Sequence, residues 1–223
     1  MTEESVLSHE TGRHVSRETF PLPPAPELPA ETSAQLEAFA GLLVQWNERI
    51  NLVSPRDVPN LWHRHIEDSL QLASLITPGA TVTDLGSGGG FPGLIIAIAC
   101  RKGTLRTPVT LIESDQRKCA FLREAARICK AEVTVVPERI EQAAGHLAPA
   151  DYVTARALAP LGTLLGWASP LLKPEGKCLF LKGRKAADEL TAARPDWHMS
   201  ERIFQSRTDP EGTILEISGL KHT

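Results

Sequence analysis

The spacing of apolar residues predicts helices in the first third of the chain. Between residues 36 and 50, large apolar side chains recur at three- and four-residue steps, which is the period of one helix face. Pro55 and Pro59 interrupt this pattern, and a second helical pattern follows over residues 61–76 until a Pro-Gly pair ends it. We therefore expect an N-terminal helical extension over residues 31–78.

From residue 80 onward, short β-type segments alternate with helical segments. The predicted strands that are each followed by a helix are 80–85, 109–112, 133–136, 151–155 and 177–181. Such alternation favours a parallel sheet with helices on both faces, because each right-handed crossover contains a helix. The last two β segments, 197–204 and 213–218, have only a short connection, so they should form an antiparallel hairpin at one edge. The sequence thus predicts a Rossmann-like α/β domain over residues 79–223.

The first 30 residues have a different composition from the rest. Five prolines crowd residues 21–29 and few large apolar side chains precede them, so we expect a disordered proline-rich tail over residues 1–30. The whole chain has 223 residues and 42% hydrophobic content, which is ordinary for a globular protein. Its formal net charge of -3 argues against general attraction to nucleic acid but leaves room for a local basic face.

Location and metal content can also be predicted. No apolar run is long enough to cross a membrane, and the N-terminus lacks a signal-peptide core, so we expect no membrane partner. The four cysteines show no close pair and no metal-binding spacing, which is typical of buried thiols in a reducing cytosol. We predict a cytoplasmic protein without a metal site.

A glycine-rich run after the first predicted strand is the most informative segment. It reads Asp84-Leu85-Gly86-Ser87-Gly88-Gly89-Gly90-Phe91-Pro92-Gly93 and precedes an apolar helical segment. A P-loop would need Gly-Lys-Ser/Thr, and a dinucleotide fingerprint would need glycine where Phe91 stands. The Asp-x-Gly-x-Gly pattern of S-adenosylmethionine-dependent methyltransferases fits Asp84, Gly86 and Gly88 directly. A carboxylate at a strand end suits a cationic sulfonium ligand, although Asp84 could instead fix the loop.

A second acidic residue stands at the end of the next predicted strand. Glu113 directly follows the segment 109–112, where a carboxylate can accept hydrogen bonds from both hydroxyls of a ribose. This arrangement serves NAD and S-adenosylmethionine alike, so Glu113 alone does not choose between them.

Several motifs, in order along the chain, resemble the RsmG family of ribosomal small-subunit RNA guanine-N7 methyltransferases, formerly called glucose-inhibited division protein B. The segment 45–54 resembles its "WN…NL(T/V)S" opening, 64–69 its "RHxxDS" segment, and 84–93 its "DxGSGxGxPG" loop. Ala155-Arg156-Ala157 and Leu181-Lys182-Gly183 are similar to its later "SRA" and "KG" motifs. The similarity runs from about residue 36 to the end and leaves the tail before Thr32 unexplained.

The resemblance implies a fold, a cofactor and binding residues. The fold would be that of a class I S-adenosylmethionine-dependent methyltransferase, with the N-terminal helices added. In the family the cofactor contacts the first loop glycine, the apolar residue before Pro-Gly, a pair in an "(S/G)R(V/A/I)E" segment, and the "SRA" arginine. The corresponding residues here are Gly86, Phe91, Ile140, Glu141 and Arg156. Without the family, Ile140 would be interpreted as a core residue and Arg156 as either an anion-binding residue or half of a salt bridge.

The chemistry of the acceptor is constrained by what the sequence lacks. Methylation of an exocyclic amine would favour an Asn/Asp-Pro-Pro-aromatic segment after the fourth predicted strand, and no such segment is present. Methylation of cytosine C5 needs a thiolate nucleophile, and no cysteine stands in a loop at the end of a predicted strand. Guanine N7 carries a lone pair and no proton, so its methylation needs alignment rather than a general base. We therefore expect no general acid or base in the site, although small-molecule acceptors could behave likewise.

Basic residues near the same sheet edge are candidates for contact with RNA phosphates. Lys182, Arg184 and Lys185 follow the fifth predicted strand, and Arg64 lies in the helical extension. The resemblance implies that the partner is small-subunit (16S) ribosomal RNA or its assembly particle, and we expect a monomer. A methyltransferase for another RNA or a small molecule, and a nucleotide-binding regulatory module, remain as alternatives.

Overall fold

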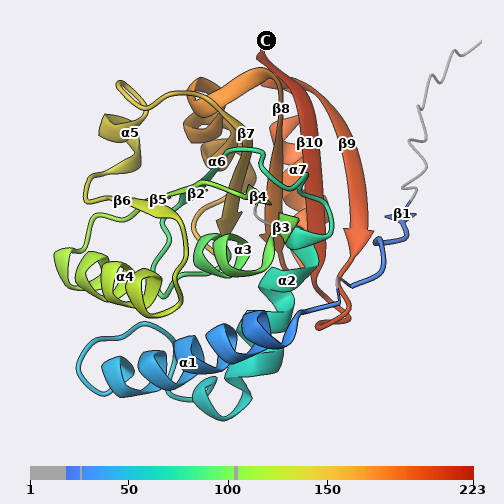
Figure 1. Cartoon of the computed structure of the whole chain (residues 1–223). Coiled ribbons are helices and arrows are strands. Elements are labelled where there is room, and N and C mark those ends of the chain that lie inside the picture. Colours follow the sequence, from blue (N-terminus) through green and yellow to red (C-terminus); the bar gives the residue numbers. More distant parts are fainter. Residues whose placement is uncertain (1–18, 26, 103–104) are drawn as a thin grey trace, which may run out of the picture.

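A computed structural model describes residues 19–25, 27–102 and 105–223. Within this part of the chain, an eight-stranded sheet runs through the centre of the molecule (Figure 1). Its strand order is β1-β9-β10-β8-β7-β2-β5-β6. The strands are β1 (Thr19–Phe20), β2 (Val82–Leu85), β5 (Val109–Ile112), β6 (Val133–Val136), β7 (Ala150–Arg156), β8 (Leu172–Lys182), β9 (Trp197–Gln205) and β10 (Thr213–His222). A separate antiparallel pair joins β3 (Arg101–Lys102) to β4 (Leu105–Arg106).

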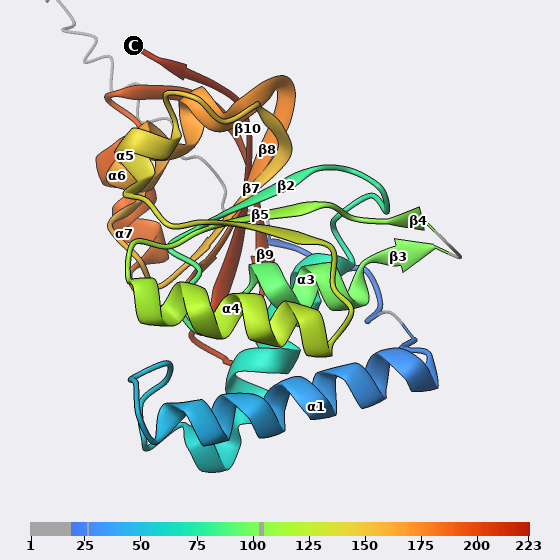
Figure 2. The same ribbon diagram turned by 60° about the vertical axis from the view of Figure 1, so that its left-hand side comes forward.

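Helices cover both faces of the sheet. They are α1 (Ala30–Asn47), α2 (Asp68–Ala73), α3 (Gly93–Ala99), α4 (Gln116–Ile128), α5 (Ile140–Ala143), α6 (Leu161–Ala168) and α7 (Ala186–Ala193), with short 3₁₀ turns at Val58–Asn60 (η1) and Ser169–Leu171 (η3). Helices α3 and α4 lie against one face and α5 to α7 against the other, and Figure 2 shows α1 outside α3 and α4. Because both faces are covered, every residue of β2 is buried.

The parallel sheet has the predicted organisation. Strand β2 pairs in parallel with β5 and with β7, while β7 pairs in parallel with β8. The carboxyl ends of these strands therefore share one edge, which is where ligands bind in open α/β sheets. The described part therefore has the expected α/β fold, with a mostly parallel sheet and a terminal antiparallel hairpin.

The N-terminal helices share a hydrophobic core with the sheet. Leu36, Phe39 and Leu43 on α1 have no exposed surface and pack in one cluster with residues of α3 and α4. Each such burial contributes roughly 1.5–3 kcal/mol. The second predicted helix is real but irregular, because a π-helical segment (η2, Trp62–Glu67) leads into α2. The division into an extension over 31–78 and a domain over 79–223 stays a prediction.

Two expectations about the chain ends need correction. Thr19 and Phe20 form β1, which pairs in parallel with β9, so the prediction of a disordered tail is wrong for this part. The reason is packing: the Phe20 ring lies 6.2 Å from that of Phe204, and Arg202 lies over it. Residues 1–18 are outside the described residues. The terminal hairpin is antiparallel as predicted, but β10 lies between β8 and β9, and β1 is outermost.

Candidate cofactor and acceptor site

The glycine-rich loop turns sharply between β2 and α3. Gly86 and Gly88 have φ values of 63° and 52°, a conformation that side chains with a Cβ rarely adopt. The loop is tied to β5, because the Ser87 N–H donates to the carbonyl oxygen of Ile112 at 3.0 Å. Leu158, which follows β7, packs over Gly86, so that a Cβ there would lie 2.6 Å from its Cδ1. The sequence pattern thus produces a main-chain surface at the sheet edge.

Glu113 fastens this loop from the end of β5. Its Oε2 accepts a hydrogen bond from the Gly88 N–H at 2.9 Å, and its Oε1 accepts from the Asp115 N–H at 2.8 Å. A carboxylate has about four acceptor positions, so two remain for other donors. Asp115 in turn caps α4 by accepting from the N–H groups of Arg117 and Lys118. Glu113 is therefore placed as predicted and also serves as a structural tie.

Asp84 lies beneath the loop rather than facing a ligand. Its side chain is 0% exposed, and its Oδ1 accepts a hydrogen bond from the Thr154 hydroxyl at 2.7 Å. Its Oδ2 has no hydrogen-bond partner, and a Cβ on Gly93 would lie 2.7 Å from it. Burial raises the pKa of Asp84 from 3.8 to about 6. Its predicted direct contact with a ligand is not supported by this placement, and the alternative, that Asp84 fixes the loop, agrees with it.

Phe91 is packed between the extension and the sheet. Its ring lies 5.5 Å from that of Phe39 and 5.0 Å from the imidazole of His65, while the Arg156 guanidinium is 5.5 Å from its centre. Since little of the ring is exposed, a ligand contact at Phe91 would involve its main chain.

Arg156 has partners that the sequence did not indicate. Its guanidinium donates to Nδ1 of His65 and to the carbonyl oxygen of Arg64, and lies 3.5 Å from Oδ2 of Asp68. The salt bridge left open as an alternative for Arg156 is therefore present, and its partner is Asp68, which η2 and α2 bring close. The side chain remains 18% exposed, so Arg156 could still contact a ligand at its edge.

His65 is held as a neutral ring by this arrangement. Burial and the charge of Arg156 lower its pKa from 6.5 to about 4. Because Nδ1 accepts from Arg156, the proton belongs on Nε2, which lies 3.6 Å from Oδ2 of Asp57. The described contacts of His65 are therefore those of a structural residue.

A polar network continues from Asp68 to the loop between β9 and β10. Asp68 Oδ1 accepts from the Thr208 hydroxyl at 2.8 Å and from the Gln71 amide at 3.1 Å. Gln71 also donates to the Ser206 hydroxyl and accepts from the Arg207 N–H. Residues more than 130 positions apart in the sequence therefore form one wall, and no local pattern could have indicated it.

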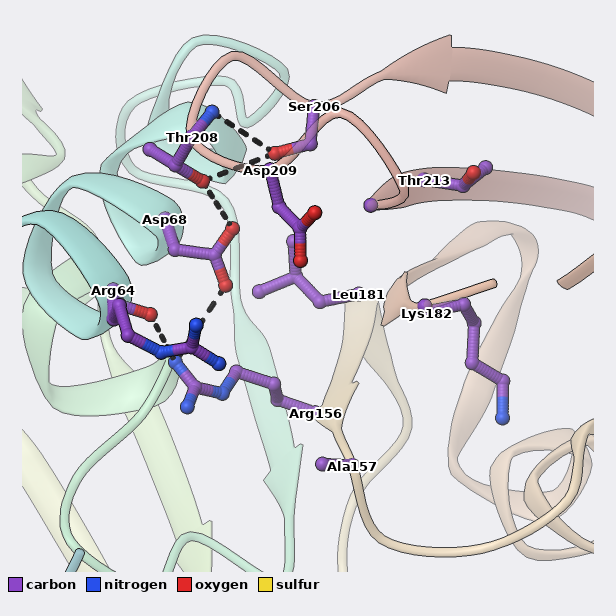
Figure 3. Close-up of a pocket in the computed structure, with 12 residues that line it drawn as sticks. Arg64, Asp68, Arg156, Ala157, Leu181, Lys182, Ser206, Thr208, Asp209 and Thr213 are labelled. Carbon is purple, nitrogen blue, oxygen red and sulfur yellow. Dashed lines mark hydrogen bonds and ion pairs between the residues drawn. The ribbon is translucent and has the colours of Figure 1, made fainter. Parts of the chain in front are cut away.

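A pocket of about 160 Å³ opens beside this wall (Figure 3). It lies at the ends of β7 and β8, between the β9–β10 loop and the helical segment 62–73, and its lining includes Arg64, Asp68, Arg156, Leu181 and Asp209. The described part of the chain thus has two adjoining features at one edge: the glycine loop after β2 and this pocket beyond Arg156.

The residues predicted to contact RNA differ in accessibility. Arg64 is 57% exposed at the pocket, paired with Asp57. Arg184 is 78% exposed, paired with Glu211, and Lys185 is exposed nearby.

The geometry of Lys182 favours an internal pairing, and its contact with RNA stays a prediction. Its side chain is 7% exposed, and its ammonium group lies 2.6 Å from Oε2 of Glu189 and donates to the carbonyl oxygen of Ala159. Lys182 is the last residue of β8, and Glu189, its partner, lies on α7. It therefore holds α7 to the loop after β7.

The remaining predicted residues lie after β6. Ile140 is buried at the start of α5 and Glu141 beside it is exposed.

The cysteines are all free and buried, and burial raises the pKa of each thiol, so none of them offers a thiolate nucleophile. Among the described residues no cluster of His, Cys, Asp and Glu could hold a metal ion.

Similarity to solved structures supports the fold. Cofactor-bound Rv0187 from MTB has a TM-score of 0.57 at 18% identity, over 83% of this chain and 90% of that one. Aeropyrum pernix fibrillarin with natively bound S-adenosyl-L-methionine has a TM-score of 0.54 at 14% identity, over 70% of this chain and 75% of that one. The fold is therefore that of the class I S-adenosylmethionine-dependent methyltransferases.

Sequence comparisons identify the family. The family model described as "GidB: rRNA small subunit methyltransferase G" matches residues 32–211, and the chain belongs to this family. A ribosomal RNA small subunit methyltransferase G from Gluconobacter oxydans is 66% identical over 86% of this chain and 95% of its own length. The Paramagnetospirillum magneticum protein of the same name is 54% identical over 84% of this chain and 88% of its own length. The resemblance found in the motifs is confirmed, and the chain is an enzyme of the methyltransferase class.

Proposed function

We propose that this chain transfers a methyl group from S-adenosylmethionine to N7 of a guanine in small-subunit ribosomal RNA. The observation that carries the proposal is the glycine loop fastened by Glu113 at the edge of a methyltransferase fold, in a chain whose family is that of the rRNA small subunit methyltransferases G. We infer that the substrate is this RNA or its assembly particle, and that the protein is therefore cytoplasmic. We also predict, separately, that it is a monomer. No described helix has the length and apolarity that crossing a membrane would require.

The residues at the edge fit the proposed cofactor. The unused acceptor positions of Glu113 suit two ribose hydroxyls, and the buried apolar side chain of Ile140 suits one face of an adenine. A Cβ at Gly88 would meet only the Gly86 carbonyl oxygen within 4 Å, at 3.7 Å, so a ligand can approach the main chain there. When bound, S-adenosylmethionine supplies an electrophilic methyl group. We assign Gly86, Gly88, Glu113, Ile140 and the main chain of Phe91 to this contact, with Glu141 and Arg156 at its margins.

The acceptor needs to be aligned rather than activated. Guanine N7 is a hydrogen-bond acceptor with a free lone pair, so no proton has to leave before it is methylated. Good alignment of two reactants can contribute about 7–11 kcal/mol to lowering the barrier. The walls of the site would therefore exclude water and orient the base, without general acid–base catalysis.

Exposed cations near the pocket suit the RNA backbone. Arg64 lines the pocket, and Arg184 and Lys185 follow Gly183, another lining residue, in the chain. Contacts of these cations with phosphates would make RNA binding salt-dependent. Lys182 is left out of this group because its side chain is only 7% exposed, whereas Arg64 and Arg184 are 57% and 78% exposed.

A transfer assay tests the proposal. The purified chain is incubated with tritiated S-adenosylmethionine and either small ribosomal particles or naked small-subunit RNA from a strain lacking this gene. We expect label in that RNA, recovered as 7-methylguanosine after digestion. Equilibrium dialysis against S-adenosylmethionine, NAD and ATP separates the enzyme from a regulatory binding module. Absence of label from both RNA substrates would defeat the proposal.

A further inference from the structure

The pocket beside the glycine loop has walls of different chemistry. Arg156 lies on its β7 side, Leu181 forms an apolar wall at the end of β8, and Asp209 enters from the β9–β10 loop (Figure 3). The pocket is separated from the glycine loop by Arg156, whose guanidinium lies over the Phe91 ring. A group in the pocket would therefore present one end toward the cofactor side of the sheet edge.

Asp209 is the acidic side chain in this pocket that has an unused hydrogen-bond acceptor. One of its oxygens, Oδ1, accepts from the Glu211 N–H at 2.9 Å, and Figure 3 shows the carboxylate pointing toward Leu181. Among the described residues no cation forms an ion pair with Asp209, and its Oδ2 accepts no hydrogen bond. Asp68, by contrast, is committed to Arg156, Thr208 and Gln71.

The loop that carries Asp209 is held firmly. The main-chain carbonyl oxygen of Asp209 accepts from the Gly212 N–H at 2.9 Å and from the Gln205 side-chain amide at 3.3 Å. The residue before it, Thr208, is bonded to Asp68 across the wall of the pocket. The carboxylate is thus a pre-positioned acceptor, which reduces the entropy lost when a ligand binds.

Guanine has the matching set of donors. Its N1–H and its exocyclic N2 amine lie side by side, and a carboxylate accepts from both in parallel because it is an acceptor at both oxygens. Adenine and the pyrimidines do not present this pair, and hypoxanthine lacks the N2 amine. N7 lies across the ring system from N2, so a base held at Asp209 directs N7 away from the β9–β10 loop and toward Arg156 and the glycine loop.

We propose that this pocket receives the target guanine and that Asp209 selects it by accepting hydrogen bonds from N1–H and N2. This inference rests on the proposed function and adds the residue that recognises the base. Leu181 and the backbone at Ala157 would contact the base, while Arg156 would lie near the O6 and N7 edge.

The first test measures binding without catalysis. Guanosine and inosine 5′-monophosphates are titrated into the S-adenosylhomocysteine-loaded chain and followed by NMR. We expect the guanine nucleotide to bind at least about fivefold more tightly, and the two to become equal in Asp209→Asn. Equal affinities in the wild type, or no binding of the guanine nucleotide at millimolar concentration, would overturn the assignment.

The second test measures methyl transfer to small ribosomal particles. Asp209→Asn should reduce the rate at least about tenfold, because one acceptor position becomes a donor facing a donor, while affinity for S-adenosylmethionine stays within about twofold. Asp196→Asn, an exposed aspartate at the opposite sheet edge, is the matched control and should keep the wild-type rate. A rate for Asp209→Asn within twofold of wild type would contradict the inference. If the wild type transfers no methyl group, the proposed function fails, and the nucleotide titration still decides the pocket.

Discussion

The main-chain N–H of Gly88 donates a hydrogen bond of 2.9 Å to Oε2 of Glu113, so the carboxylate that ends β5 holds the loop that follows β2. The same side chain is the one proposed to accept the ribose hydroxyls. A single residue therefore links the shape of the loop to the affinity for the cofactor.

Replacing Glu113 by Gln should weaken S-adenosylmethionine binding about 10- to 100-fold, since hydrogen bonds to charged groups contribute roughly 1.5–3 kcal/mol. Isothermal titration calorimetry measures this directly. Glu132→Gln, an exposed glutamate before β6, is the control and should bind like the wild type. Unchanged affinity in Glu113→Gln would remove Glu113 from the cofactor site.

Replacing Gly86 by Val should abolish cofactor binding. The backbone at Gly86 has φ 63°, which costs roughly 1–2 kcal/mol for a residue with a Cβ, and the branched side chain would meet Leu158 and the space proposed for the ligand. Gly162→Ala on α6, where nothing lies within 4 Å, is the control. Equilibrium dialysis compares the three proteins after circular dichroism shows that they are folded. Wild-type affinity in Gly86→Val would place the ligand elsewhere.

His65 should make the fold sensitive to acid. Its pKa is lowered in the folded state from 6.5 to about 4, so the unfolded chain binds more protons between these values and stability falls as the pH drops through this range. Groups around it include Arg156, Asp57 and Arg64. The pKa of Asp84 is raised from 3.8 to about 6, so Asp84 shifts the pH dependence of stability in the opposite direction. Asp84 is present both in the wild type and in a His65→Gln variant, so its effect cancels when the two are compared.

Urea unfolding of the wild type and His65→Gln across this pH range provides the measurement. The variant should lose less stability than the wild type between pH 6.5 and about 4, and His198→Gln, at an exposed site, should follow the wild type. Parallel curves for wild type and His65→Gln would show that His65 is not buried as a neutral ring.

The segment before α1 should contribute to stability. Phe20 packs on Phe204 and beneath Arg202, and Arg207 donates to the carbonyl oxygens of Leu22 and Pro23. Phe20→Ala should lower the free energy of unfolding by about 1–3 kcal/mol, less than for a fully buried phenylalanine. Val44→Ala on the exposed side of α1 should change it by less than about 0.5 kcal/mol. If Phe20→Ala has no effect on urea unfolding, the segment is not packed as described.

The sequence predicted the parts of the fold that depend on local patterns. Strands 109–112 and 133–136 were predicted with the observed bounds, because short runs rich in apolar and β-branched residues are local signals. The position of β10 between β8 and β9, and the pairing of β1, depend on contacts between distant segments, so the sequence did not reveal them.

The same division holds for the site. The glycine loop and Glu113 were found because strand ends and glycine spacing are visible in the sequence. The partners of Arg156, the internal pairing of Lys182 and the pocket at Asp209 were not, since each depends on which surfaces the N-terminal helices and the β9–β10 loop bring together.

Mass spectrometric mapping of modified nucleosides in small-subunit ribosomal RNA, with and without this gene, tests the central claim most directly. We predict that one guanine carries an N7 methyl group only when the gene is present, and that the wild-type gene restores it whereas the Gly86→Val gene does not. Identical nucleoside maps in the two strains would contradict the assignment.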